Sequence, residues 1–196
     1  MDKSIIKTSL NLLGKYLICL TMAFIISASL FMVFTATSQS GDTVVGMPRI
    51  IMLVIMQICS LGTVILFMNG KVYYIADSDA NKVRFGRIEA DKYKGLKFSL
   101  FPTLLALGSY VVLVLGKLGI IKGGYAIFNV LNYHLFGYHE FIFGGVKNAA
   151  EIGWGGIIAA SLTVFLIPVI CHISYTLGFK GINIAERLVF KKKETK

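Results

Sequence analysis

Acidic residues are scarce in this chain of 196 residues, which has 10 Asp and Glu against 20 Lys and Arg. None of those carboxylates falls inside one of the long apolar runs. Ion-coupled transporters usually relay ions or protons through acids at membrane depth. Their absence from the apolar runs therefore argues against that class of protein.

The sequence also lacks the common catalytic and nucleotide-binding patterns. It contains no Walker A, GxSxG, HExxH or Rossmann glycine motif. Its three cysteines, Cys19, Cys59 and Cys171, form no CxxC pair and lie in apolar runs, so we expect small apolar fillers and no disulfide framework. We therefore expect a protein that is not an enzyme and that needs no cofactor or metal.

The stretch DSDANKVRFG, residues 77–86, begins like a calcium loop but does not continue like one. Asp77, Asp79 and Asn81 match the first three ligand positions. Lys82 then stands where the loop needs Gly, and Ile88 where it needs a bidentate Glu. We expect DSDAN to form an Asx-type turn or helix cap, and residues 82–85 to be extended before a turn at Gly86.

Long apolar runs dominate the chain, which is 56% hydrophobic and only 15% charged. A helix needs about 20 apolar residues to cross the hydrocarbon core of a bilayer. The sequence predicts an all-α membrane protein, a four-helix transmembrane bundle in a single domain. The predicted spans are residues 16–34, 50–68, 98–115 and 157–177.

The cations are concentrated on one side of these predicted spans. They fall before the first span, in the loop 69–97 and in the tail 178–196, whereas few fall in the connections on the other side. Cytoplasmic segments are enriched in Lys and Arg, so we expect a multi-pass protein of the cell membrane with both termini cytoplasmic. The net charge of +10 is then explained by topology and by attraction to anionic lipid headgroups, without a nucleic-acid partner.

An alternative for the first run is a signal peptide cleaved near Ser38, after the sequence TATSQS. Its apolar core is longer than is usual for such peptides, so we favour retention. Retention also gives an even number of spans, which keeps both basic ends on one side.

The external segment, residues 116–156, is aromatic and semi-apolar, but it is too polar for a good span. We expect one or two short helices that lie in the outer interface or dip back into the bundle. His134, His139 and Glu140 would serve a lipid-modifying enzyme only if they converged. The spacing of the two histidines does not place them on one helix face.

Two polar residues within the predicted spans are candidates for intramembrane function. Gln57 is expected to hydrogen-bond across helices, with a pathway-lining role as the alternative. His172 is expected to be neutral and bonded to Ser174, Tyr175 or another helix, with proton coupling as the alternative. Small residues four apart, such as Gly156 and Ala160, favour close helix packing within the chain or in a homo-oligomer.

A family resemblance is carried by the loop and the tail. The stretches DSDANKVRFGRIEADKYKGLKFSLFP, GKLG and GFKGINIAERLVFKKK resemble a group of small four-span bacterial membrane proteins that are uncharacterised. The resemblance implies a bacterial membrane setting and a four-span layout. It implies no activity.

The leading functional prediction is a non-enzymatic accessory subunit that binds another membrane component. The predicted contacts with that partner or with lipid headgroups are Arg84, Arg87, Lys191, Lys192 and Lys193. The alternative is a small oligomeric transporter or channel that works through Gln57 and His172. A packed site around these two residues would argue against it.

Overall fold

The computed structural model describes residues 3–37 and 47–182, and these residues form helices and turns with no strand among them. Four helices are long and apolar enough to cross a membrane, as the sequence predicts. They are α1 (Lys3–Thr37), α2 (Met47–Arg84), α4 (Leu100–Lys117) and α7 (Trp154–Phe179). The short helices are α3 (Lys94–Phe98), α5 (Gly124–Leu131), η1 (Tyr133–Leu135), α6 (Phe136–Phe143) and η2 (Ala149–Glu151).

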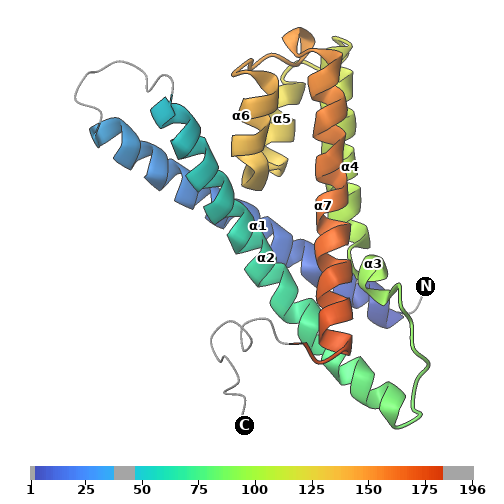
Figure 1. The fold of residues 1–196 in the computed structure, drawn as a ribbon. Coiled ribbons are helices and arrows are strands. Elements are labelled where there is room, and N and C mark those ends of the chain that lie inside the picture. The colour runs from blue at the N-terminus through green and yellow to red at the C-terminus, as the bar shows by residue number, and fades with distance from the viewer. Residues whose placement is uncertain (1–2, 38–46, 183–196) are drawn as a thin grey trace.

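The long helices form two antiparallel pairs, α1 with α2 and α4 with α7 (Figure 1). We call the end where α1 begins and where α2 and α7 finish the basic end, and the opposite end the hairpin end. The two pairs cross near the basic end and diverge toward the other. Helices α5 and α6, with η1 between them, occupy the space between the diverging pairs, and we call residues 124–143 the hairpin.

Two apolar clusters hold this arrangement together. The first lies where the pairs cross and joins α1, α2, α3 and α7; its members include Leu12, Tyr16, Met68, Val72, Phe98, Ile167 and Tyr175. The second lies at the hairpin end and joins α4, α5, α6 and α7; its members include Leu113, Phe128, Phe143, Ile157 and Ala160. Large apolar side chains such as Leu66, Ile158 and Leu162 are exposed on the outward faces of the long helices.

The crossing of α2 and α7 is close because Gly178 has no side chain. A Cβ at this position would lie 2.5 Å from the carbonyl oxygen of Tyr73 and 2.9 Å from the Cβ of Ala76. Backbone cannot yield at such distances, so α7 approaches α2 only with Gly here. The close contact between α2 and α7 therefore depends on Gly178.

The predicted loop 69–97 is wrong in its first half, because α2 continues to Arg84. Residues 77–81 form neither an Asx turn nor a cap, and residues 82–84 are not extended. The reason is long-range: the carboxylate of Asp79 bonds to Lys94 and Tyr175 and does not compete for nearby backbone amides. The predicted turn at Gly86 is confirmed, with φ at +67°.

Candidate functional site

Helix α2 reaches well past the crossing of the helix pairs at the basic end (Figure 1). Its 38 residues correspond to about 57 Å of helix, whereas the hydrocarbon core of a bilayer is about 30 Å thick. It finishes in a Schellman motif: Gly86 N–H donates to the Val83 carbonyl and Arg87 N–H to the Lys82 carbonyl, both at 2.9 Å. The left-handed conformation of Gly86 makes this sharp stop possible.

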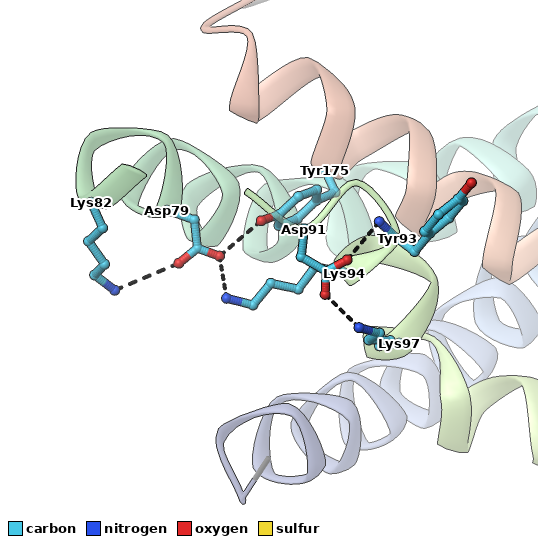
Figure 2. Close-up of polar contacts among 7 residues, drawn as sticks. All are labelled: Asp79, Lys82, Asp91, Tyr93, Lys94, Lys97 and Tyr175. Carbon is cyan, nitrogen blue, oxygen red and sulfur yellow. Dashed lines mark hydrogen bonds and ion pairs between the residues drawn. The ribbon is translucent and has the colours of Figure 1, made fainter. Parts of the chain in front are cut away.

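Asp79 links the end of α2 to the following segment and to α7 (Figure 2). Its carboxylate is almost fully buried and lies 2.7 Å from the Lys94 ammonium. The Tyr175 hydroxyl donates to the same oxygen at 3.1 Å, and the Lys82 ammonium lies 3.7 Å from the other oxygen. A buried carboxylate needs several partners of this kind. Asp79 thus fixes α2, α3 and α7 to one another.

The segment between α2 and α3 has its own anchor in Asp91. The carboxylate accepts a hydrogen bond from the Lys97 ammonium at 2.6 Å and another from the Tyr93 backbone N–H at 3.0 Å (Figure 2). The bond from Lys97 is the main cause that holds the pKa of Asp91 below its ordinary value. The second bond is an Asx turn, which starts the chain into α3.

Helix α3 lies directly on α7. A Cβ at Gly95 would be 2.7 Å from both the Cys171 carbonyl oxygen and the Tyr175 Cβ. Phe98 meets the Tyr175 ring edge-on, with 5.9 Å between centroids, and the Lys94 ammonium lies 5.9 Å from the centre of the Phe98 ring. Asp91 thus ties the segment after α2 to α3, and α3 is in turn held to α2 by Lys94 and packed on α7.

Arg84 and Arg87 are exposed on this anchored extension. Neither takes part in any of the ion pairs found among the described residues. Between them stands Phe85, whose side chain is 73% exposed. Lys191, Lys192 and Lys193 lie outside the described residues. The structure thus places two unpaired guanidinium groups and an aromatic ring together on a held surface, which we call the α2 tip, residues 84–87.

Gln57 has a different role from those two arginines, because it bonds to the hairpin. Its Nε2 donates to the His134 carbonyl at 3.1 Å, and its Oε1 accepts from the Tyr138 backbone N–H at 3.0 Å. That N–H is in the first turn of α6, where helix amides lack partners of their own. The N-cap residue, Leu135, has no side-chain acceptor. Gln57 therefore caps α6 from a neighbouring helix.

The other three long helices also bond to the hairpin. From α1, the Tyr16 hydroxyl donates to the Leu131 carbonyl at 3.2 Å. On α4, the Ser109 hydroxyl accepts from the Asn132 side-chain amide at 2.7 Å. The hairpin's Tyr138 hydroxyl donates to the Ala159 carbonyl of α7 at 2.9 Å. Of the two arrangements that the sequence leaves open, the segment thus takes the inward one, packed among the long helices.

His134 and His139 are both buried in this hairpin, whereas Glu140 turns toward other partners. The carboxylate of Glu140 lies 3.2 Å from the Arg49 guanidinium and accepts from the Tyr125 hydroxyl at 3.3 Å. No hydrogen bond joins it to either imidazole among the described residues. No group of three or more potential metal ligands occurs in the described part of the chain. The three side chains therefore do not converge as a lipid-modifying enzyme would require.

His172 is half-buried on α7, and its Nδ1 has no hydrogen-bond partner among the described residues. The expected bonds to Ser174 or Tyr175 are absent there, since the Tyr175 hydroxyl bonds to Asp79. His172 lies beside α3, with its Cα 3.0 Å from where a Gly95 Cβ would be. Gln57 faces the hairpin instead, so the structure does not bring these two candidates together.

No protein-family model, curated protein or solved structure matches this chain.

The organising residues of the basic end, Asp79, Lys94 and Tyr175, cannot be identified as a group from the sequence. They come from three separate segments, and Asp79 has ordinary local alternatives as a cap or turn residue. The one usable signal was the helical register of α2. It places Asp79 on the same face as Val72 and Ala76, both of which are buried.

Proposed function

We propose that this chain crosses the cell membrane four times, through α1, α2, α4 and α7, with both termini in the cytoplasm. Four apolar helices and their exposed apolar outer faces support the crossing. The start of α1 and the ends of α2 and α7 lie at the same end of the molecule (Figure 1). Most of the described cations lie there too, which supports that end as the cytoplasmic one.

In this setting the chain acts as a non-enzymatic accessory subunit that binds another membrane component through the α2 tip. The observation that carries the proposal is the pairing of exposure with rigidity. Arg84, Phe85 and Arg87 are exposed, and the helix that presents them is held to α3 and α7 by the buried Asp79. A preorganised side chain loses less freedom on binding, which favours affinity.

The chemistry of the α2 tip favours an acidic partner. Guanidinium groups bind carboxylates through two parallel hydrogen bonds, and aromatic side chains often anchor the centre of an interface. The partner is thus an acidic cytoplasmic segment of a membrane protein with an apolar side chain to place against Phe85. Anionic lipid headgroups contact the remaining cations of the basic end, and nucleic acid has no part in this function.

The test is site-specific photocrosslinking in native membranes. A benzophenone amino acid replaces Phe85, and a second chain carries it at Ile58, which is exposed on the outer face of α2. We expect one discrete protein adduct from position 85, with an acidic crosslinked peptide on the partner, and none from position 58. Adducts with lipid alone, or with a second copy of this chain, would overturn the proposal.

Charge-matched variants complete the test. Arg84→Ala/Arg87→Ala should reduce the adduct at least tenfold, which corresponds to two weak ion pairs. Lys122→Ala/Lys147→Ala removes the same charge from exposed positions at the hairpin end and should leave it unchanged. Equal loss in both variants would mean that net charge alone matters and that the α2 tip is not the binding surface.

The alternative, a small oligomeric transporter or channel, has less support. Gln57 is occupied by the hairpin backbone, and His172 lies against α3. Gly156 packs within the chain, because a Cβ at this position would lie 3.1 Å from Ile152 and 3.2 Å from Phe143. No observation assigns these residues to a pathway or to a contact between copies.

A further inference from the structure

The turn of the hairpin places two imidazole rings deep between the helix pairs. His134 is 1% exposed and His139 is fully buried. His134 meets the ring of Tyr16 edge-on, with 5.4 Å between centroids. His139 lies 4.7 Å from the Phe128 ring centre and stacks on Phe143 at 5.7 Å. Their immediate neighbours are thus mainly aromatic.

Neither ring has a hydrogen-bond partner at Nδ1 or Nε2 among the described residues. The carboxamide oxygens of Asn129 and Asn132 are also buried without a partner among the described residues and bond to neither ring, whereas several other polar side chains around the hairpin bond elsewhere. Gln57 bonds to backbone, Ser109 bonds to Asn132, and the Tyr138 hydroxyl donates to Ala159. Since no group among the described residues accepts a hydrogen bond from either imidazole, no such bond offsets the cost of charging the ring.

Among the described residues, no charged group forms a hydrogen bond or an ion pair with either ring. On α1 the titratable neighbours are Tyr16 and, one turn on, Cys19; on α2, Arg49 reaches the hairpin and pairs with Glu140, and Cys59 is exposed. Within the hairpin the titratable groups are Tyr125, Tyr133, Tyr138 and Glu140, and Glu140 bonds to Arg49 and Tyr125. The segments of α4 and α7 that bond to the hairpin do so through Ser109 and the Ala159 carbonyl, which carry no charge, and Tyr110 of α4 packs against the cluster that contains Phe128 and Phe143.

The consequence for protonation is large. Burial lowers the pKa of His134 to about 3, and burial, with His134 as a second cause, lowers that of His139 to about 3. A histidine exposed to water titrates near 6.5. The packed hairpin therefore binds fewer protons than an open one across the window from about pH 6.5 down to 3, so it is destabilised as the pH falls through that window.

We propose that the hairpin, residues 124–143, is an acid-opened element: protonation of His134 and His139 releases it from between the two helix pairs. In the neutral state, hydrogen bonds from all four long helices hold it in place. In the protonated state, two adjacent cations without counter-ions make the packed position unfavourable, and the hairpin moves to water or to the membrane interface. This device does not depend on the α2 tip or on the proposed partner.

The size of the effect follows from proton linkage. At about pH 5 each histidine shifts the ratio of open to packed hairpin by about 30-fold, and the two together by about 1,000-fold. With two histidines the ratio of open to packed hairpin changes steeply with pH, by about the square of the change that one histidine would give.

Distance measurement between spin labels tests the proposal on the full chain in lipid nanodiscs. The native Cys19, Cys59 and Cys171 are replaced by Ala, and labels are attached at Phe141→Cys on α6 and Leu66→Cys on α2. Both positions are exposed. We expect one distance at about pH 7.5 and a second, longer population that grows toward about pH 5. A single unchanged distance across this range overturns the proposal.

Two substitutions identify the titrating groups. His134→Phe/His139→Phe keeps aromatic rings in place without a proton site, and should keep the single distance at about pH 5. His172→Phe removes the third histidine, which is outside the hairpin, and should open like the unmodified chain. Opening that persists unchanged in the double variant overturns the proposal.

Two further measurements keep the test decisive. Labels at Leu66 and Leu162, on α2 and α7, should show one distance throughout, because the long helices stay assembled; if they separate, acid unfolds the whole bundle and the proposal fails. If the double Phe variant does not pack at about pH 7.5, single His134→Gln and His139→Gln variants replace it. Each should open with a shallower pH response, and an unaltered slope in both contradicts the assignment.

Discussion

Two buried polar sites in this molecule are treated in opposite ways. At the basic end, Asp79 has a carboxylate that is 4% exposed and is met by Lys94, Tyr175 and Lys82. At the hairpin end, His134 and His139 are as deeply buried, but their ring nitrogens have no hydrogen-bond partner among the described residues. One site is built for a charge and the other excludes it.

The difference shows that burial alone does not determine the role of a polar side chain, because its hydrogen-bond and ion-pair partners also matter. A buried charge with several well-placed partners holds structural elements together, because removing one partner leaves the remaining charge buried and uncompensated. A buried neutral group that can take up a proton makes the stability of its structural element depend on pH. The basic end is therefore a fixed clamp, and the hairpin end is the part of the fold that responds.

The largest expected effect comes from removing the charge at the clamp. Asp79→Ala leaves the Lys94 ammonium and the Tyr175 hydroxyl without their partner, and should lower the free energy of unfolding by about 3 kcal/mol. Thermal unfolding in detergent measures it. Asp77→Ala, an exposed carboxylate two residues away on α2, should change it by less than about 0.5 kcal/mol. Equal losses would mean that Asp79 is not the clamp.

An intermediate effect is expected where the hairpin is capped from α2. Gln57→Leu leaves the His134 carbonyl and the Tyr138 N–H unpaired, which should cost about 1–2 kcal/mol. Hydrogen–deuterium exchange should speed up at residues 132–139 and stay constant in α3. Thr63→Ala removes a hydroxyl that bonds within its own helix and serves as the control. Unchanged exchange in the hairpin would show that Gln57 does not hold it.

The smallest effect belongs to the half-exposed pair of Asp91 and Lys97. Because the hydrogen bond from Lys97 lowers the pKa of Asp91, the pair stabilises the fold above the ordinary carboxyl pKa, and this contribution is lost as the pH falls below it. We expect a few tenths of a kcal/mol, since water screens the pair. Carbon-13 NMR titration should show the Asp91 pKa rising in Lys97→Gln. An unmoved Asp91 titration would contradict this assignment.

Much of the helical architecture could be predicted from the sequence. The apolar runs 50–68 and 157–177 lie wholly within α2 and α7, and the run 98–115 differs from α4 by two residues at each end. The length of an apolar run is a local property of the sequence, so each helix can be predicted without knowing which helices pack beside it.

The continuation of α2 through Asp79 could not be predicted in this way. Asp, Ser and Asn together are typical of turns, and the local sequence gives no sign of the lysine and tyrosine that bind the carboxylate. Those partners, Lys94 and Tyr175, are distant in the chain and meet Asp79 only once α3 and α7 are packed. Here the tertiary contacts of Asp79 outweigh the local preference of residues 77–81 for a turn.

The site residues follow the same rule. The exposure of Arg84 and Arg87 agrees with their position in a polar stretch, whereas the capping of α6 by Gln57 joins residues on separate helices. The inward packing of the hairpin was one of two predicted arrangements. It was decided by bonds to Tyr16 and Ser109, which no pattern within residues 124–143 contains.

The bond between Tyr138 and the Ala159 carbonyl also sets an order of assembly. The ribosome makes the hairpin before it makes α7, and α7 supplies one wall of the space that the hairpin fills. Until that last long helix has been made, the hairpin lacks one of the four long helices that bond to it. During synthesis the bonds to α1, α2 and α4 can therefore form first, and the bond to α7 is the last that the hairpin gains.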